Sequence, residues 1–229
     1  NIIRYKAEMK TRWNEFVDIS KNATFLFKRE YMDYHSDHFS DHCLLFEDDK
    51  NKLLAIMPAN QKADALVSHG GLTYGGILSD ASMTTPRMVE LFDKLHIYGQ
   101  SNGIKSIIYK TIPYIYSLIP AQEDQYVLFR NDASLSRRDV LAVIEQSNRL
   151  PYQGRRKRKI KQAQKAGLGV KKTTNYETFW SILEENLRQR HNVNPVHSLS
   201  EITLLAGRFP ENIHLHICSD REKILAGAV

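Results

Sequence analysis

The sequence repeats one order of elements, and this repeat constrains the fold more than any other feature. A strand-like run, a helix that carries Trp13, a short second helix and a β-hairpin follow one another in the first 57 residues. The same order, with Trp180 in its first helix, returns after residue 167. Recurrence of a whole supersecondary unit is typical of a duplicated architecture. We therefore predict two copies of one structural unit.

The hairpins of the two copies also match in sequence. Their second arms read Lys-Leu-Leu-Ala-Ile from Lys52 and Lys-Ile-Leu-Ala-Gly from Lys223. The tryptophan lies 41 residues before the central leucine of this run in the first copy and 45 residues before it in the second. The second copy ends at Val229, inside an apolar strand. Because an unpaired apolar edge invites aggregation, we expect the second copy to be incomplete and the sequence to be a fragment.

Periodicity and turn residues predict the individual elements. In the first copy we expect strands at 2–6, 42–47, 52–57, 72–78, 104–110, 126–130 and 140–145, helices at 11–20, 29–35 and 86–102, the last closed by Gly103, and a helical turn at 114–119. In the second copy we expect a strand at 168–173, helices at 176–190 and 197–208, and a hairpin of 213–218 and 223–229 joined by a polar turn at 219–222. The resulting domains are 1–148, a basic connecting helix at 149–167, and the start of a second domain at 168–229.

Composition restricts the class of protein. Hydrophobic residues make up 42% of the 229 residues, which is enough for a packed core. No apolar run approaches the roughly 18 residues of a membrane span, and the first residues lack the plan of a signal peptide. Cys43 and Cys218 lie too far apart in sequence to indicate a disulfide framework or a zinc motif. We expect a cytoplasmic protein without a membrane span.

The formal charge of +6 comes from one segment. Ten basic residues and no acidic one lie between residues 149 and 172, so the remaining 22 Lys and Arg face 26 Asp and Glu elsewhere. The segment can track a phosphate backbone, grip a phosphorylated precursor or CoA, or form a solvated linker helix. The candidate polyanion-binding residues are Arg155, Arg156, Lys157, Arg158, Lys159 and Lys161.

Two groups of histidines have the composition of metal sites. The first combines His35, His38 and His42 with Asp37 and Asp41, and the second is His214, His216 and Cys218. The first group lies in a polar stretch that is typical of a turn, and the second alternates along a strand, so that it shares one sheet face. We expect no metal in either group. Spacing alone also yields no Ser-His-Asp or Cys-His set, so the sequence offers no covalent nucleophile.

Three segments carry a family resemblance. They are Ser-His-Gly-Gly-Leu-Thr-Tyr-Gly-Gly at 68–76, Lys-Thr-Ile-Pro-Tyr-Ile-Tyr at 110–116, and the basic stretch from Arg155 to Gly167. With the order of elements, they resemble the FemAB-like (FemABX) transferases, which are built from tandem GNAT units. The resemblance covers essentially the whole chain. It implies an α/β (α+β) fold with a GNAT-like mixed sheet flanked by helices.

The resemblance also implies an activity. Members of this family transfer an acyl or aminoacyl group to an amine, and the donor is aminoacyl-tRNA in peptidoglycan synthesis or acyl-CoA in typical GNAT relatives. The acceptor is a cell-wall precursor or another small molecule, and tRNA is a candidate partner. GNAT relatives bind CoA with Gln or Arg-x-x-Gly-x-Gly or Ala ahead of a helix, and we expect no such loop in this sequence, since residues 70–76 lack its spacing. The alternative is a non-catalytic binding protein that holds a polyanion.

Residues 68–76 are the candidate substrate-binding surface, because glycine allows another chain to approach closely. A bulged strand is the structural alternative. His69 is the single weak candidate for a general base, with a hydrogen-bonded structural role as its alternative. Pro113 and Tyr116 line a cleft in one interpretation and a core or turn in the other. The substrate-binding candidates are His69, Gly70, Gly71, Tyr74, Gly75, Gly76, Pro113 and Tyr116, and the catalytic residue is unknown.

Overall fold

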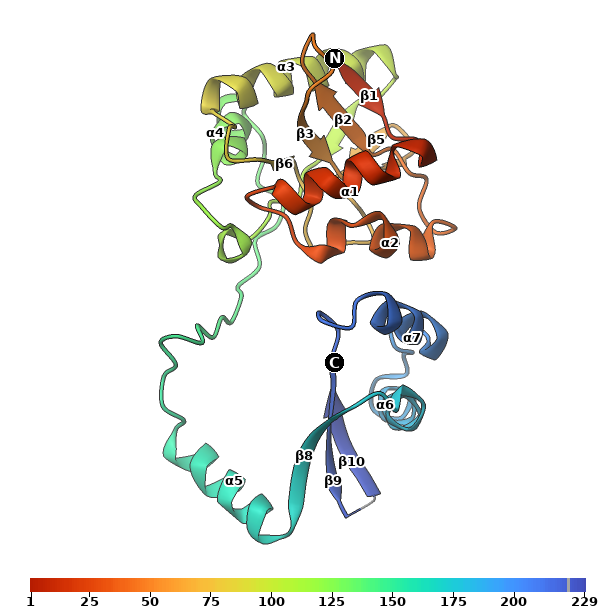
Figure 1. Ribbon diagram of the computed structural model, residues 1–229, viewed down its shortest axis with the longest axis vertical. Coiled ribbons are helices and arrows are strands. Elements are labelled where there is room, and N and C mark those ends of the chain that lie inside the picture. The colour runs from red at the N-terminus through yellow and green to blue at the C-terminus, as the bar shows by residue number, and fades with distance from the viewer. Residues whose placement is uncertain (222) are drawn as a thin grey trace. The chain divides into compact units, whose positions relative to one another are not determined.

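The computed structural model describes residues 1–221 and 223–229 and divides into two compact units (Figure 1). Unit 1 spans Asn1–Ser136 and unit 2 spans Arg137–Val229. The domain limits expected at residues 148 and 167 stay predictions, and Glu222 of the predicted turn at 219–222 lies outside the described residues.

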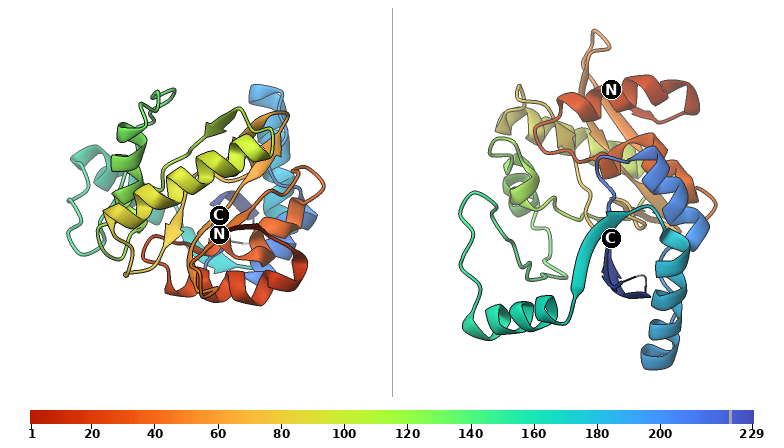
Figure 2. Two further views of the ribbon diagram at one scale, coloured as in Figure 1. Left: turned by 90° about the horizontal axis from the view of Figure 1, so that it is seen from above. Right: turned by 60° about the horizontal axis from the view of Figure 1, so that its bottom comes forward.

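Unit 1 is built around a four-stranded antiparallel sheet with the strand order β1-β2-β3-β6. These strands are β1 (Ile2–Arg4), β2 (Leu44–Glu47), β3 (Leu53–Met57) and β6 (Leu78–Ser79). Helix α3 (Thr85–Ser101) lies on one face, and helices α1 (Lys10–Ile19) and α2 (Arg29–Met32) lie on the other (Figure 2). The sheet is therefore covered on both sides.

Alternation along β2 explains the two cores of unit 1. Leu44 and Phe46 pack with Leu91 and Leu95 of α3, whereas Leu45 packs with the aromatic residues of α1. Successive side chains of a strand point to opposite faces, so an unbroken apolar run is required where both faces are covered. All four residues of β2 are buried, in agreement with that rule.

A second, smaller sheet in unit 1 has the order β4-β5-β7. Its strands are β4 (Asn60–Lys62), β5 (Ala65–Val67) and β7 (Ser106–Ile108), and β5 pairs with β7 in parallel. The chain then forms the turn η4 (Tyr114–Tyr116) and helix α4 (Glu123–Arg130), which packs on α3. The mixed character expected of the sheet arises at the pairing of β5 with β7.

Three expectations for unit 1 and the connecting segment were wrong, and two short strands were missed. Residues 72–77 form a turn rather than most of a strand, and only Leu78–Ser79 is extended. Residues 126–130 belong to α4, because Asp124 and Val127 repeat at helical spacing on its buried side. Residues 140–145 form no regular element and are exposed. The short strands β4 and β5 were missed, since three-residue strands give little periodic signal.

Unit 2 contains the basic helix α5 (Gly154–Lys165) and a three-stranded antiparallel sheet of order β10-β9-β8. The strands are β8 (Leu168–Thr173), β9 (Leu215–Asp220) and β10 (Lys223–Ala228). Helices α6 (Tyr176–His191) and α7 (Leu199–Arg208) cover one face through a core that includes Trp180, Leu205 and Leu215. A capping box between Ser198 and Glu201 begins α7.

Both tryptophans make the same contact in their copies. The indole N–H of Trp13 donates to the carbonyl of Phe27 at 2.8 Å, immediately before α2. The indole N–H of Trp180 donates to the carbonyl of His197 at 2.9 Å, immediately before α7. In each copy, therefore, the first helix holds the start of the second through its tryptophan.

The two hairpins share a β-bulge as well as a similar sequence. The register of β3 shifts between Leu53 and Ala55, and this leaves Leu54 as an extra residue. The register of β10 shifts between Ile224 and Ala226 and leaves Leu225 as the extra residue. A bulge at the equivalent leucine supports the tandem relationship, because bulges are retained as features of a fold.

Among the described residues, no helix combines the length and apolar character that are needed to cross a membrane.

Candidate functional site

The glycine segment, residues 68–76, forms a tight turn that links β5 to β6. His69 takes a left-handed backbone conformation with φ of 70°, and the N–H of Leu72 donates to its carbonyl at 3.2 Å. The N–H of Gly70 donates to the side chain of Asn60. The segment is therefore a turn whose backbone is held from several sides, and the bulged strand given as the structural alternative is not formed.

Gly75 and Gly76 are required by close packing. A Cβ atom on Gly75 would lie 1.8 Å from the carbonyl oxygen of Ser68, so only glycine fits at this crossing of the chain. A Cβ atom on Gly76 would lie 2.8 Å from the hydroxyl of Tyr109, and the φ of Gly76 is 94°. Both glycines therefore have a structural reason that is independent of any ligand.

Two consecutive residues at the end of β7 hold the two ends of this turn. The ammonium of Lys110 donates to the carbonyls of His69 at 3.0 Å and Leu72 at 2.7 Å. The hydroxyl of Tyr109 accepts the N–H of Ile77 at 2.7 Å. Neighbouring residues of an extended chain point to opposite sides, which explains how one dipeptide reaches both ends. Sequence reasoning missed this role, although Lys110 opens one of the motifs.

A buried carboxyl group supports Tyr109 from behind. The Tyr109 hydroxyl donates to Oδ2 of Asp124 at 2.7 Å, at the start of α4. Burial raises the pKa of Asp124 above its usual value, and the hydrogen bond from Tyr109 opposes this effect. Burial, and then the charge of Asp124, raise the pKa of Tyr109 well above its usual value. Next to this pair, the buried ammonium of Lys21 binds Glu123, so charged partners fix the beginning of α4.

An aromatic pair lies at the end of the glycine segment. The rings of Tyr74 and Tyr116 stack with centroids 5.0 Å apart, and the Tyr74 hydroxyl lies 3.2 Å from Oγ1 of Thr24. Tyr74 is 8% exposed and Tyr116 is 41% exposed, so the outer ring is open to solvent. Pro113 accepts the N–H of Tyr116 at 3.1 Å and so shapes the turn η4. The structure therefore brings Pro113 and Tyr116 together with the glycine segment.

His69 is embedded in this turn. Its side chain is 4% exposed, its ring lies 5.3 Å from that of Phe39, and its Nδ1 accepts the N–H of Gly71 at 3.2 Å. A ring nitrogen that accepts a backbone N–H leaves the proton on the other nitrogen. This geometry explains His69 as a residue that organises the turn.

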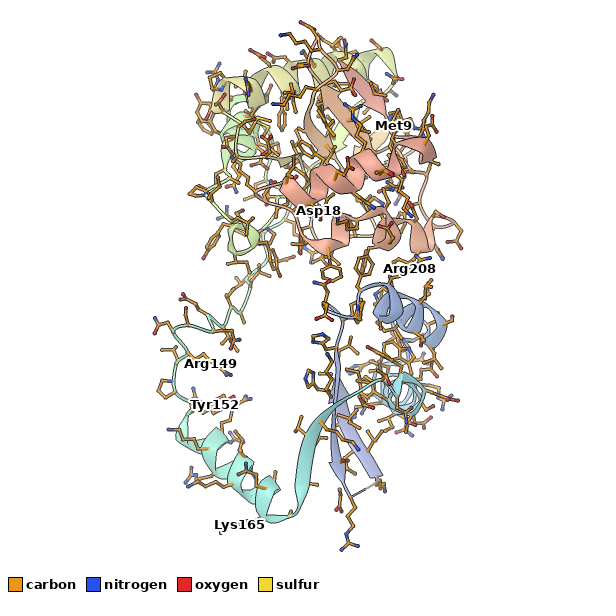
Figure 3. The ribbon with its side chains drawn as sticks, in the orientation of Figure 1. Met9, Asp18, Arg149, Tyr152, Lys165 and Arg208 are labelled. Atoms are coloured by element: carbon orange, nitrogen blue, oxygen red, sulfur yellow. The ribbon has the colours of Figure 1, made fainter. Side chains whose placement is uncertain are left out.

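The polyanion-binding candidates lie together on α5, in unit 2. Figure 3 shows the stretch from Arg149 through Tyr152 to Lys165, with its side chains directed away from the ribbon. All six candidates are exposed, and among the described residues none of them pairs with a carboxylate. The helix belongs to unit 2, whereas the glycine segment belongs to unit 1.

The expectation that no stretch has the spacing of the CoA loop was wrong, because one such stretch lies outside the glycine segment. Gln164-Lys165-Ala166-Gly167-Leu168-Gly169 fits Gln-x-x-Gly-x-Gly. This stretch ends α5 and enters β8, whereas the CoA loop works by directing N–H groups from the beginning of a helix. It therefore does not fit CoA pyrophosphate. Among the described side chains, no group of three or more His, Cys, Asp or Glu gathers as metal ligands do, and the side chain of His35 is not among those described.

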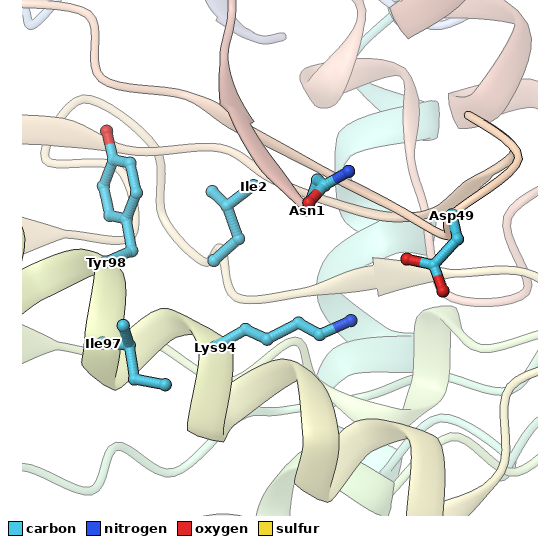
Figure 4. Close-up of a pocket in the computed structure, with 6 residues that line it drawn as sticks. All are labelled: Asn1, Ile2, Asp49, Lys94, Ile97 and Tyr98. Atoms are coloured by element: carbon cyan, nitrogen blue, oxygen red, sulfur yellow. The ribbon is translucent and has the colours of Figure 1, made fainter.

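A hollow of about 310 Å³ lies elsewhere in unit 1 (Figure 4). Its lining consists of Asn1, Ile2, Asp49, Lys94, Ile97 and Tyr98. None of the predicted site residues takes part in it. The hollow is lined by the chain start, the hairpin turn and α3. We therefore retain the glycine segment as the candidate site.

Comparison with known proteins supports the architecture. No protein-family profile matches the sequence, and no curated protein does. The chain matches the crystal structure of FemX with a TM-score of 0.55, at 10% sequence identity, over 95% of this chain and 57% of that chain. The chain has the FemX fold. The FemAB-like α+β architecture expected from the sequence is therefore confirmed, and this chain spans 57% of the length of FemX.

Proposed function

We propose that this chain belongs to a FemAB-like transferase that moves an activated acyl or aminoacyl group to an amine. The observation that carries the proposal is the FemX fold over 95% of the chain. The glycine segment supplies the second support, because it presents the exposed Gly70 beside the exposed ring of Tyr116, which stacks on Tyr74. The acceptor in this proposal is a cell-wall precursor or a related small amine, and the reaction takes place in the cytoplasm.

In this proposal the glycine segment holds the acceptor in unit 1. The outer face of Tyr116 offers a ring to stack on, and the backbone of Gly70 and, in part, of Gly71 is open to solvent in the glycine segment. Gly75 and Gly76, in contrast, are packed against the protein itself. Pro113 and Tyr74 fix the position of that ring. Positioning of the amine against the activated carbonyl, with N–H groups at the developing oxyanion, can account for much of the rate. The proposal does not need His69 as a base.

The proposal leaves two possible donors, aminoacyl-tRNA and acyl-CoA. Aminoacyl-tRNA is favoured by the six exposed cations of α5, whereas the one stretch with CoA-loop spacing does not precede a helix. Thermal shift of the whole protein with charged tRNA, acetyl-CoA and longer acyl-CoAs tests the donor. A ligand at a hundred times its Kd stabilises the folded state by about 2.7 kcal/mol. We expect a shift with charged tRNA, and the absence of any shift with all three donors would contradict a transferase.

A second candidate function is a non-catalytic binding protein with the same fold. The observation in its favour is again α5, which needs no acyl donor to bind a polyanion. Uncharged tRNA distinguishes the two, because a binding protein gains the same stability from charged and uncharged forms. A transferase that recognises the aminoacyl ester gains more from the charged form.

A further inference from the structure

Helix α5 carries positive charge on all sides. Arg155, Arg156, Lys157, Arg158 and Lys159 are consecutive, and successive residues of a helix are turned by about 100°. None of the residues of α5 is buried, and Ile160 is 38% exposed. Its apolar side chains are confined to Ile160 and the half-buried Ala163, a stripe too narrow to anchor the helix on a membrane.

The sequence of α5 contains several features that destabilise an isolated helix. The N-cap residue Gln153 makes no side-chain capping bond, and the first turn contains no acidic residue. Arg155 and Arg156 lie instead at the positive end of the helix dipole, where cations are unfavourable. Like charges three and four residues apart repel each other. Arg, Lys, Gln and Ala favour helix intrinsically, but a helix of 12 residues without packing is marginal in water.

An anionic partner would remove each of these penalties at once. A partner on one side only would leave the cations of the other side unpaired, so charge on all faces fits a groove with phosphates along both walls. We propose that α5 inserts between the phosphate strands of an RNA stem and that its helix becomes fully ordered only on binding. This inference rests on the proposed function, in which a tRNA is the donor. The cations of α5 would pair with phosphates, so we expect the binding to depend steeply on salt.

Fluorescence anisotropy with the whole protein measures the binding. The probes are an RNA duplex of about 16 base pairs, the DNA duplex of the same sequence, a single-stranded RNA and phosphatidylglycerol vesicles. We expect the RNA duplex to bind most tightly, with affinity falling steeply between about 50 and 200 mM salt. Tighter binding to the vesicles than to the RNA duplex would overturn the proposal.

A variant that removes four positive charges from α5, but keeps its helix propensity, tests whether α5 makes the contact. Arg156→Gln, Lys157→Gln, Lys159→Gln and Lys161→Gln are combined, because Gln and Lys have similar propensity. Each lost phosphate contact lowers the salt slope by about 0.9, so the four together lower it by about 3 to 4 and raise Kd at 0.1 M salt at least about a hundredfold. The matched control removes four exposed cations of unit 1: Lys50, Lys62, Lys94 and Arg130. Equal losses in both variants would overturn the assignment to α5.

Hydrogen exchange tests the coupled ordering. In the free protein we expect the amides of residues 155–165 to exchange close to the rate of an open chain, and we expect at least about tenfold protection with the RNA duplex. Full protection of α5 without RNA would contradict coupled ordering. These experiments need no acyl transfer. RNA binding without product therefore refutes the transferase and leaves this inference intact, and transfer from acyl-CoA without RNA binding does the reverse.

Discussion

Replacement of Lys110 by Met tests whether the end of β7 holds the glycine segment. The change removes the two charge-assisted bonds to the carbonyls of His69 and Leu72 but keeps the aliphatic stem. Loss of a donor from a partly buried carbonyl costs about 1–3 kcal/mol, so we expect a total loss of about 2–4 kcal/mol. For a unit of this size, that loss lowers Tm by about 6–15 °C.

Urea and thermal unfolding measure the loss, and hydrogen exchange of residues 68–77 locates it. Lys105→Met is the matched control, because Lys105 lies just before β7, is 80% exposed and makes one surface ion pair with Asp64. Lys110→Arg keeps a cation that can reach the same carbonyls, and we expect it to recover much of the stability. If Lys110→Met lost no more stability than the Lys105 control, the two carbonyl contacts would not hold the turn.

Three further predictions follow from backbone strain, burial and titration. Gly76→Ala meets both a positive φ and a tyrosine hydroxyl, so urea unfolding should show a loss above about 2 kcal/mol, whereas Gly103→Ala, with φ of 68° and open space, should lose only about 1 kcal/mol. Burial raises the pKa of Asp124, so its protonated form stabilises the fold below pH 4, and this contribution disappears as pH rises through the folded pKa. In urea titrations, the free energy of unfolding of Asp124→Asn should therefore rise relative to that of the wild type between pH 4 and pH 7. A difference between the two proteins that stays constant with pH would contradict this prediction. Burial raises the pKa of the Cys43 thiol, so a thiol reagent should label the native protein only at the other cysteine.

The sequence predicted the parts of the fold that repeat and that alternate strongly. The Trp-bearing helices, both hairpins and α3 follow long periodic patterns, and these patterns agree with the elements observed. The equivalence of Leu54 and Leu225 was visible as a matched run of residues, although the bulge at each position required coordinates. Strong local patterning and tertiary packing agree at these places.

The sequence failed where a short apolar run has two interpretations. Residues 126–130 are rich in β-formers but complete a helix that begins at Glu123, whose acidic first turn suits a helix N-terminus. Residues 72–77 have strand-like composition, but Gly75 must cross the carbonyl of Ser68 and the chain turns there. Tertiary crossings of this kind leave no periodic signal in a single sequence.

The sequence indicated the residues that form the candidate surface, but it did not indicate the residues that hold this surface in place. The glycines, Tyr74, Pro113 and Tyr116 were identified from motifs, and the structure brings them together in unit 1. The supporting roles of Tyr109 and Asp124 depend on a contact between residues 15 positions apart, for which the sequence offered no motif. Lys110 opens one of the motifs, and this position was the signal by which its role could have been found.

Product analysis tests the central claim most directly. The whole protein is incubated with aminoacyl-tRNA carrying a labelled amino acid and with an amine-bearing cell-wall precursor, and the products are separated after mild base treatment. The account predicts label in an amide, which survives the base that cleaves the tRNA ester, and a higher KM for the precursor after Tyr116→Ala with little change in kcat. Label that remains entirely in the ester, while the protein binds the tRNA, would contradict transfer and favour the binding protein.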